Sequence, residues 1–252
     1  MRTFAAFSAK RSDVGFHSLR FSYGRAGHFQ RRWLEDSIIG MVILRGYQFS
    51  VYNRIARVAL HEKDVAYEIE EIDPFQANLP HDHLKRHPFG RVPVLSHGGF
   101  DIYETAAINR YVESAFEGPS LLPTEAETVG RVAQVVSIVD SYGYRPMIRQ
   151  VFAHRVFRPS VGEDSDKTEM SQGLEASLPV LGALNALAVE GRVLNGKAFT
   201  LADCHLAPMI AYFVQAAEGA NALKEYSAIV DWWAFAAERK SVVETDPGLP
   251  SS

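Results

Sequence analysis

Two short stretches of the chain have the residue types and spacing of a site that binds a ligand through its backbone and an anionic group. The first stretch is Arg91-Val92-Pro93. Its proline is the second residue of a run, Val92 to Leu95, that reads as a buried strand. Proline cannot donate to a sheet, so it belongs at a strand start, at a sheet edge or in a cis turn that leaves the strand end open for another partner. In the second, Glu104 and Thr105 stand at a predicted helix start, whose free N–H groups and dipole favour an anion.

The histidines near residue 85 and the single cysteine are candidates for a metal site and for redox chemistry, but their surroundings favour neither. His83 and His87 are four residues apart and follow His81 closely. No secure helix is predicted there and no carboxylate-rich shell follows, so we predict that the protein has no metal site. The single cysteine, Cys204, rules out an intramolecular disulfide, suits a reducing compartment and is predicted to be a small core residue.

Composition separates the first forty residues from the rest. The 252-residue chain is 47% hydrophobic, with a net charge of −4 and a pI near 6.1, which argues against nucleic-acid binding. Residues 1–40 hold seven basic and three acidic side chains, a charge of +4, so the remainder carries −8. They show no core-forming pattern and are predicted to be an unstructured leader, either a presequence or an extension before a mis-assigned start at Met41. No apolar stretch is long enough for a membrane helix.

From Met41 the hydrophobic pattern changes once, from mixed to helical. A domain over 41–117 is predicted to hold strands at 42–44, 65–70, 92–95 and 100–103, helices starting near 51 and 104, and a loop with one helical turn at 74–86. After a linker, a domain over 124–248 is predicted to be all-helical, with segments 125–157, 167–190, 200–217, 220–226 and 228–240 and a kink at Pro146. The sequence therefore predicts an α+β fold class.

Three motifs on these elements resemble one family. HPFGRVPVL (87–95), YETAAI (103–108) and FTLAD (199–203) follow in order at suitable separations. They resemble the cytosolic glutathione S-transferase family, in particular its serine-type members such as the phi, tau-like and bacterial ones. The resemblance covers Met41 to Gly248 and implies a thioredoxin-like N-terminal domain followed by an all-α domain.

The resemblance implies how glutathione is held. A cis bond before Pro93 would turn the N–H and C=O of Val92 outward, to pair with the cysteinyl backbone of glutathione. Thr105 would receive the γ-glutamyl carboxylate and Glu104 its ammonium. Arg91 would hold the glycyl carboxylate. Each role has a purely structural alternative. Pro93 could be a trans proline at an edge strand, Glu104 and Thr105 could simply cap the helix, and Arg91 could be a solvated surface charge.

The resemblance also implies a hydroxyl that stabilises the glutathione thiolate. Ser50, at the predicted helix start, is our expected catalytic residue, and Tyr47, just after the first strand, is the alternative. Tyr52 and Asn53 are further candidates. An electrophile pocket is expected in the helical domain at Tyr142, Tyr144 and Arg145, where simple helix packing is the competing interpretation.

The expected function is that of a glutathione transferase, an enzyme of detoxification that adds reduced glutathione to small hydrophobic electrophiles. The alternatives are a non-catalytic ligand-binding or regulatory protein of the same fold, or a glutathione-dependent dehalogenase, isomerase or peroxidase. The resemblance implies glutathione as co-substrate, no permanently bound cofactor, a homodimer and a cytoplasmic location, with no nucleic-acid or membrane partner.

Overall fold

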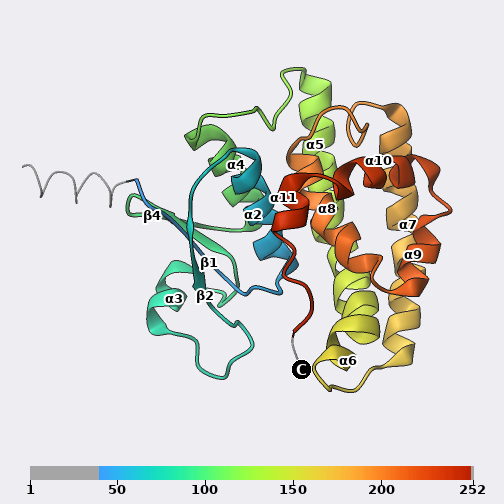
Figure 1. The fold of residues 1–252 in the computed structure, drawn as a ribbon, viewed down its shortest axis with the longest axis horizontal. Coiled ribbons are helices and arrows are strands. Elements are labelled where there is room, and N and C mark those ends of the chain that lie inside the picture. The colour runs from blue at the N-terminus through green and yellow to red at the C-terminus, as the bar shows by residue number, and fades with distance from the viewer. Residues whose placement is uncertain (1–39, 251–252) are drawn as a thin grey trace, which may run out of the picture. The chain divides into compact units, whose positions relative to one another are not determined.

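The computed structural model describes residues 40–250, and the predicted leader at 1–40 lies outside the described residues except for its last position. A four-stranded sheet is formed by β1 (Val42–Gly46), β2 (Glu68–Glu71), β3 (Val94–His97) and β4 (Phe100–Tyr103) in the order β2-β1-β3-β4. β1 pairs parallel with β2 and antiparallel with β3, which pairs antiparallel with β4. Helix α2 (Val51–Glu62) connects β1 to β2, α3 (His81–Arg86) connects β2 to β3, and α4 (Thr105–Ala115) follows β4 (Figure 1).

The sheet domain follows the predicted order of elements, with shifts at two strand starts. β2 begins at Glu68 rather than at residue 65. β3 begins at Val94 rather than Val92, because Pro93 has no N–H to donate to the ladder. The region 81–86, predicted to be a loop with one helical turn, is a short helix.

The rest of the described chain is helical, and within the described residues no strand follows Tyr103. Its elements are α5 (Ala126–Ile138), η1 (Val139–Gly143), η2 (Arg145–Phe157), α6 (Arg158–Ser160), α7 (Lys167–Glu190), α8 (Leu201–Phe213), α9 (Ala217–Leu223), α10 (Ser227–Ala237) and α11 (Lys240–Glu244). The α+β class and the thioredoxin-like sheet followed by helices are confirmed.

The predicted kink at Pro146 takes a different form. From Val139 to Phe157 the helix winds as a π-helix, whose hydrogen bonds span five residues rather than four. Tyr144, between the two π segments, keeps ordinary right-handed helical dihedrals. The wider winding changes which side chains share a face, and this decides the lining of the cavity described below.

Helix α8 is the core of the helical domain and begins with the FTLAD motif. Thr200 and Asp203 form a reciprocal capping box at its start. Every residue from Leu201 to Phe213 is buried except Ala211, and α8 packs against α2, α5, η2 and α10 (Figure 1). Cys204 is completely buried in this helix, as predicted.

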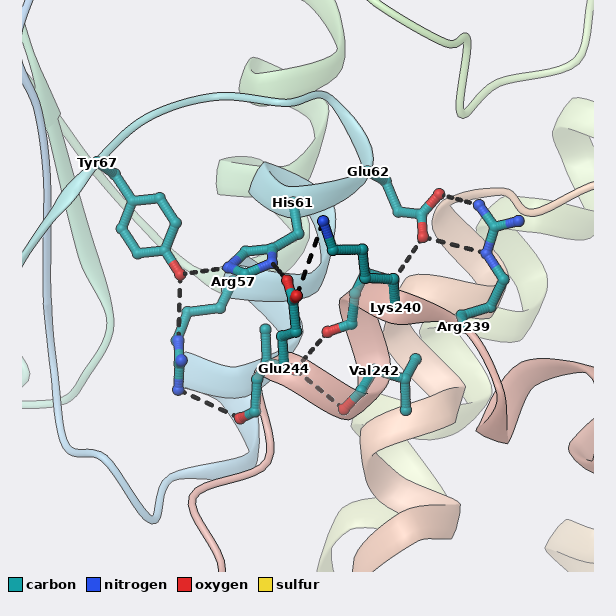
Figure 2. Close-up of polar contacts among 10 residues, drawn as sticks. Arg57, His61, Glu62, Tyr67, Arg239, Lys240, Val242 and Glu244 are labelled. Carbon is teal, nitrogen blue, oxygen red and sulfur yellow. Dashed lines mark hydrogen bonds and ion pairs between the residues drawn. The ribbon is translucent and has the colours of Figure 1, made fainter.

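A polar network ties the second half of α2 to α11, near the C-terminal end of the described chain (Figure 2). The Tyr67 hydroxyl lies 3.2 Å from Arg57 Nε and 3.1 Å from His61 Nε2, and the other ring nitrogen of His61 faces Glu244. Glu62 accepts from Arg239 and from the Ser241 hydroxyl. Helix α2, which Ser50 caps, is thereby held by contacts to Tyr67 near β2 and to α11 at the end of the helical part.

Among the described residues, no helix has the length and apolar character needed to cross a bilayer.

Candidate active site

A cavity of about 850 Å³ opens between the sheet domain and the π-helical segment. Eight of the ten residues predicted for the site line it: Tyr47, Ser50, Arg91, Val92, Pro93, Glu104, Thr105 and Tyr144. They come from the β1–α2 loop, the segment before β3, the start of α4 and the η1–η2 junction. Residues far apart in the sequence therefore meet around one hollow, an arrangement common in ligand-binding sites.

The Val92–Pro93 peptide bond is cis, as predicted. Val92 precedes β3, and among the described residues its N–H and C=O have no hydrogen-bond partner. Arg91, which is exposed, is held through its carbonyl oxygen, 2.9 Å from His83 Nε2. The segment thus presents an unpaired backbone edge to the cavity while α3 fixes its position.

The start of α4 leaves its first backbone donors available. Glu104 is the N-cap residue, but its side chain makes no capping hydrogen bond. Its φ of 68° lies in the left-handed region, which a residue with a Cβ adopts only at a cost. Thr105, the first helical residue, is buried against the cavity. The competing interpretation of Glu104 as a plain side-chain cap does not match this geometry.

Ser50 caps α2 without using its hydroxyl proton. Its Oγ accepts a hydrogen bond from the Asn53 N–H at 3.3 Å. An acceptor contact occupies a lone pair of the hydroxyl and leaves the O–H free to donate, and no described residue accepts from it. The Asn53 side chain donates to the Tyr47 carbonyl and fills the space above Gly46, where a Cβ would lie 2.1 Å from Asn53 Oδ1. The loop that carries Ser50 is thereby held in place.

The Tyr47 hydroxyl is less suited to stabilising an anion. Burial raises the pKa of this phenol, and the carboxylates Asp73 and Glu71 raise it further. A phenol of higher pKa is a weaker proton donor, and nearby negative charge opposes a thiolate. The ring itself packs at 5.5 Å from Phe49 and 6.0 Å from Phe75, as part of an aromatic wall.

The structure corrects two of the three residues predicted for the electrophile pocket. Tyr142 and Arg145 are exposed and do not line the cavity. Along this π-helical segment the side chains on the cavity face recur at intervals of four to five residues. Those on that face are Asp140, Tyr144, Ile148, Arg149, Phe152, Ala153 and Phe157. Tyr142 falls midway between Asp140 and Tyr144, on the opposite side of the helix.

Sequence reasoning missed most of the apolar wall. Phe49, Phe75, Phe152 and Phe157 line the cavity, and the Phe49 ring lies 5.7 Å from that of Phe157. These phenylalanines come from separate segments and share no local pattern, so only the three-dimensional arrangement shows that they form one surface.

His87, in the same wall, is a buried histidine whose protonation the fold disfavours. It is 2% exposed, its ring lies 4.5 Å from that of Tyr103, and no described residue bonds to its Nδ1. Burial lowers the pKa of His87 to about 4, helped by the neighbouring His83 and Arg91. Below the ordinary histidine pKa the unfolded chain therefore binds a proton that the folded chain does not.

We expect the free energy of unfolding to fall as the pH drops from about 6.5 to about 4, because protonation favours the unfolded state over that window. His87 should account for about 1–3 kcal/mol of the loss, less than the full pKa difference because the cavity admits solvent. Urea unfolding near neutral pH and at about pH 4 measures it. His87→Gln should lose less unfolding free energy than wild type over this pH range, whereas the exposed control His81→Gln should lose as much as wild type. Equal acid sensitivity of His87→Gln and wild type would contradict the assignment.

Comparison with known proteins decides the family. Residues 44–120 match the family described as "Glutathione S-transferase, N-terminal domain". Glutathione S-transferase F10 of Arabidopsis thaliana is 30% identical over 181 residues, which make up 71% of this chain and 84% of that protein. The chain belongs to the glutathione S-transferase family.

Further relatives extend the match over both domains. Glutathione S-transferase 3 of Zea mays is 29% identical over 217 residues, 83% of this chain and 96% of that protein. The solved structure of glutathione S-transferase III in its apo form superposes with a TM-score of 0.74 at 25% identity, covering 84% of this chain and all of that one. The family recognised from the three motifs is confirmed.

Proposed function

We propose that this glutathione S-transferase family member conjugates reduced glutathione to small hydrophobic electrophiles through a stabilised thiolate. One observation carries the proposal. A single cavity combines four features. They are the unpaired backbone N–H and C=O of Val92, the available N–H groups at the start of α4 near Thr105, the Ser50 O–H that donates to no described residue, and a wall of aromatic side chains. The first three suit a peptide with carboxylates and a thiol, and the fourth suits an apolar second substrate.

Glutathione would lie along the sheet-domain side of this cavity. Its cysteinyl backbone would pair with Val92, its γ-glutamyl carboxylate would face the N-terminus of α4 at Thr105, and its ammonium would face Glu104. Arg91 would hold the glycyl carboxylate as a charge-assisted pair. This placement leaves the thiol near the start of α2, where Ser50 stands.

The thiol has to be ionised to react. A free thiol has a pKa near 8.5, and lowering it by about two units requires about 2.7 kcal/mol of selective stabilisation of the thiolate. The Ser50 hydroxyl proton together with the N-terminus of α2 supplies donors of the right kind.

The ultraviolet absorbance of glutathione thiolate against pH tests the proposal directly. We expect the pKa of bound glutathione to lie well below 8.5, and neutral aryl halides to be conjugated faster than in solution.

Thr105→Ala should weaken glutathione binding by about 1.5–3 kcal/mol in calorimetry, since it removes a hydrogen bond to a charged group. The exposed control Thr124→Ala should bind as wild type does. Glutathione binding unchanged in Thr105→Ala would refute the placement.

We further propose that the protein acts as a homodimer. Phe100 lies on the edge strand β4 with 48% of its surface exposed, and its ring packs 5.1 Å from that of Tyr111. An exposed apolar group at a sheet edge suits a contact between two copies of the chain. Sedimentation equilibrium distinguishes a dimer from a monomer.

A further inference from the structure

Asp140 is a second carboxylate, besides Glu104, in the wall of the cavity. Asp140 lies in the first turn of η1 and lines the cavity, with 35% of its side chain exposed. It is not required by the placement of glutathione proposed above. Its surroundings show that it is held in a fixed position.

The first group that fixes Asp140 is a buried histidine of another helix. His205, on α8, is completely buried, and its Nε2 lies 2.8 Å from Asp140 Oδ1. Its Nδ1 is buried without a hydrogen-bond partner among the described residues. An Nε2–H group of His205 can donate to the Asp140 carboxylate, so the hydrogen bond joins α8 to η1.

The second group is Tyr52, in the first turn of α2. Burial raises the pKa of the Tyr52 phenol, and the nearby Asp140 carboxylate raises it further, so Tyr52 stays a neutral donor beside Asp140. The Tyr52 ring lies 4.8 Å from that of Tyr144 and 6.4 Å from that of His205. Asp140 on η1 is therefore bonded to His205 on α8, with Tyr52 of α2 nearby, and Tyr52 and Tyr144 line the same cavity.

A fixed carboxylate in an aromatic pocket discriminates between ligands by charge. A bound cation or N–H donor gains a charge-assisted hydrogen bond and contact with the tyrosine faces. A bound carboxylate meets like charge after losing its hydration. Arg149 also lines the cavity, with its guanidinium 5.6 Å from the centre of the Phe75 ring. Unlike Asp140, it makes no hydrogen bond or ion pair to another described residue, so its charge is not held at a fixed position.

We infer that Asp140, positioned by His205 and Tyr52, selects aromatic electrophiles that carry a cationic or N–H-donating group over those that carry a carboxylate. The inference rests on the proposed function and names the substrate class of its second binding site. Asp140 is the specificity-determining residue, and His205 is a positioning residue that acts through it.

Three electrophiles that differ only in one substituent test this selection. They are 4-(chloromethyl)benzamidine, 4-(chloromethyl)benzamide and 4-(chloromethyl)benzoic acid, which are cationic, neutral and anionic at neutral pH. We expect kcat/KM, corrected for the uncatalysed rate, to be at least about tenfold higher for the amidine than for the acid, mainly through KM. Asp140→Asn should reduce this ratio to near one.

The role of His205 has its own readout. His205→Phe should lower the amidine-to-acid ratio in part, and His205→Gln should restore it, because glutamine keeps an N–H donor. If His205→Phe fails to fold, Asp140→Asn decides the proposal alone, since its partly exposed side chain tolerates an isosteric amide. Exposed Asp231, outside the cavity, provides the matched control Asp231→Asn, which should keep the wild-type ratio.

Calorimetry separates the ways in which the inference can fail. Wild-type protein should bind the S-(4-amidinobenzyl) conjugate of glutathione more tightly than the S-(4-carboxybenzyl) conjugate, and Asp140→Asn should lose that difference. If Asp140→Asn weakens glutathione itself and leaves the ratio unchanged, Asp140 belongs to the glutathione ammonium and the inference is overturned. An unchanged ratio with normal glutathione binding also overturns it and leaves the proposed function standing. If glutathione does not bind at all, the proposed function fails with it.

Discussion

Ser50→Ala is expected to lower the rate of glutathione conjugation by about two to three orders of magnitude while glutathione affinity changes little. Removing a single hydrogen-bond donor from a developing or stabilised anion has this size of effect in other enzymes. The Ser50 hydroxyl is the donor that the structure leaves unused, because its oxygen serves α2 only as an acceptor. Affinity is spared because the backbone and the two carboxylates of glutathione provide most of its contacts.

The pKa of bound glutathione is the measurement that links this loss to the thiol. In Ser50→Ala it should rise toward about 8.5, the value of a free thiol. The N-terminus of α2 still favours the thiolate, so a residual rate above the solution reaction should remain. Tyr47→Phe should change both quantities only slightly, since the Tyr47 ring acts mainly in packing against Phe49 and Phe75.

The capping role of Ser50 has to be separated from its role toward sulfur. Ser50→Ala removes the N-cap as well, at a cost of about 1 kcal/mol in stability, whereas glycine is a better cap than alanine. Ser50→Gly should therefore lose activity as Ser50→Ala does while unfolding closer to wild type. A Tyr47→Phe variant without a thiolate signal, beside a Ser50→Ala variant that keeps it, would make the protein tyrosine-type and reverse the assignment.

The part of the site that could be predicted is the part built from short sequence motifs. These motifs lie at the start of a strand (Val92-Pro93) or at the start of a helix (Glu104-Thr105 and Ser50). The local backbone geometry explains why a proline, an acidic residue or a hydroxyl stands at each position. Their meeting around one cavity depends on the strand order β2-β1-β3-β4, which the structure shows and the motifs do not.

The electrophile side could not be predicted in the same way. Its residues recur every four to five positions along a π-helical segment. The sequence interpretation relied instead on the polar residues just before Pro146, of which Tyr142 and Arg145 are exposed. The Asp140–His205 pair joins residues 65 positions apart, so no local pattern reveals it. Likewise α11 is too short to show a period, although it fixes α2.

The largest stability effect is expected at Asp203, where a predicted motif acquires a partner that its sequence does not show. Asp203 is completely buried. Its Oδ2 accepts from the backbone N–H and the hydroxyl of Thr200, each at 2.7 Å, and its Oδ1 accepts from the Trp232 indole N–H at 2.7 Å. Burial raises the pKa of this carboxyl, and the donated hydrogen bonds oppose the rise. The FTLAD capping box therefore also fastens α10 to α8.

Asp203→Ala should destabilise the protein by about 3–5 kcal/mol, because it leaves buried donors of Thr200 and Trp232 without a partner and opens a small cavity. Urea unfolding measures the loss, and the matched control Asp231→Ala, on the exposed face of α10, should stay within about 0.5 kcal/mol of wild type. Trp232→Phe removes only the indole donor and should cost less. In the double variant the two losses should be less than additive, since the hydrogen bond between these residues can be lost only once. Additive losses, or an Asp203→Ala variant as stable as Asp231→Ala, would show that the buried carboxylate does not hold α8 to α10.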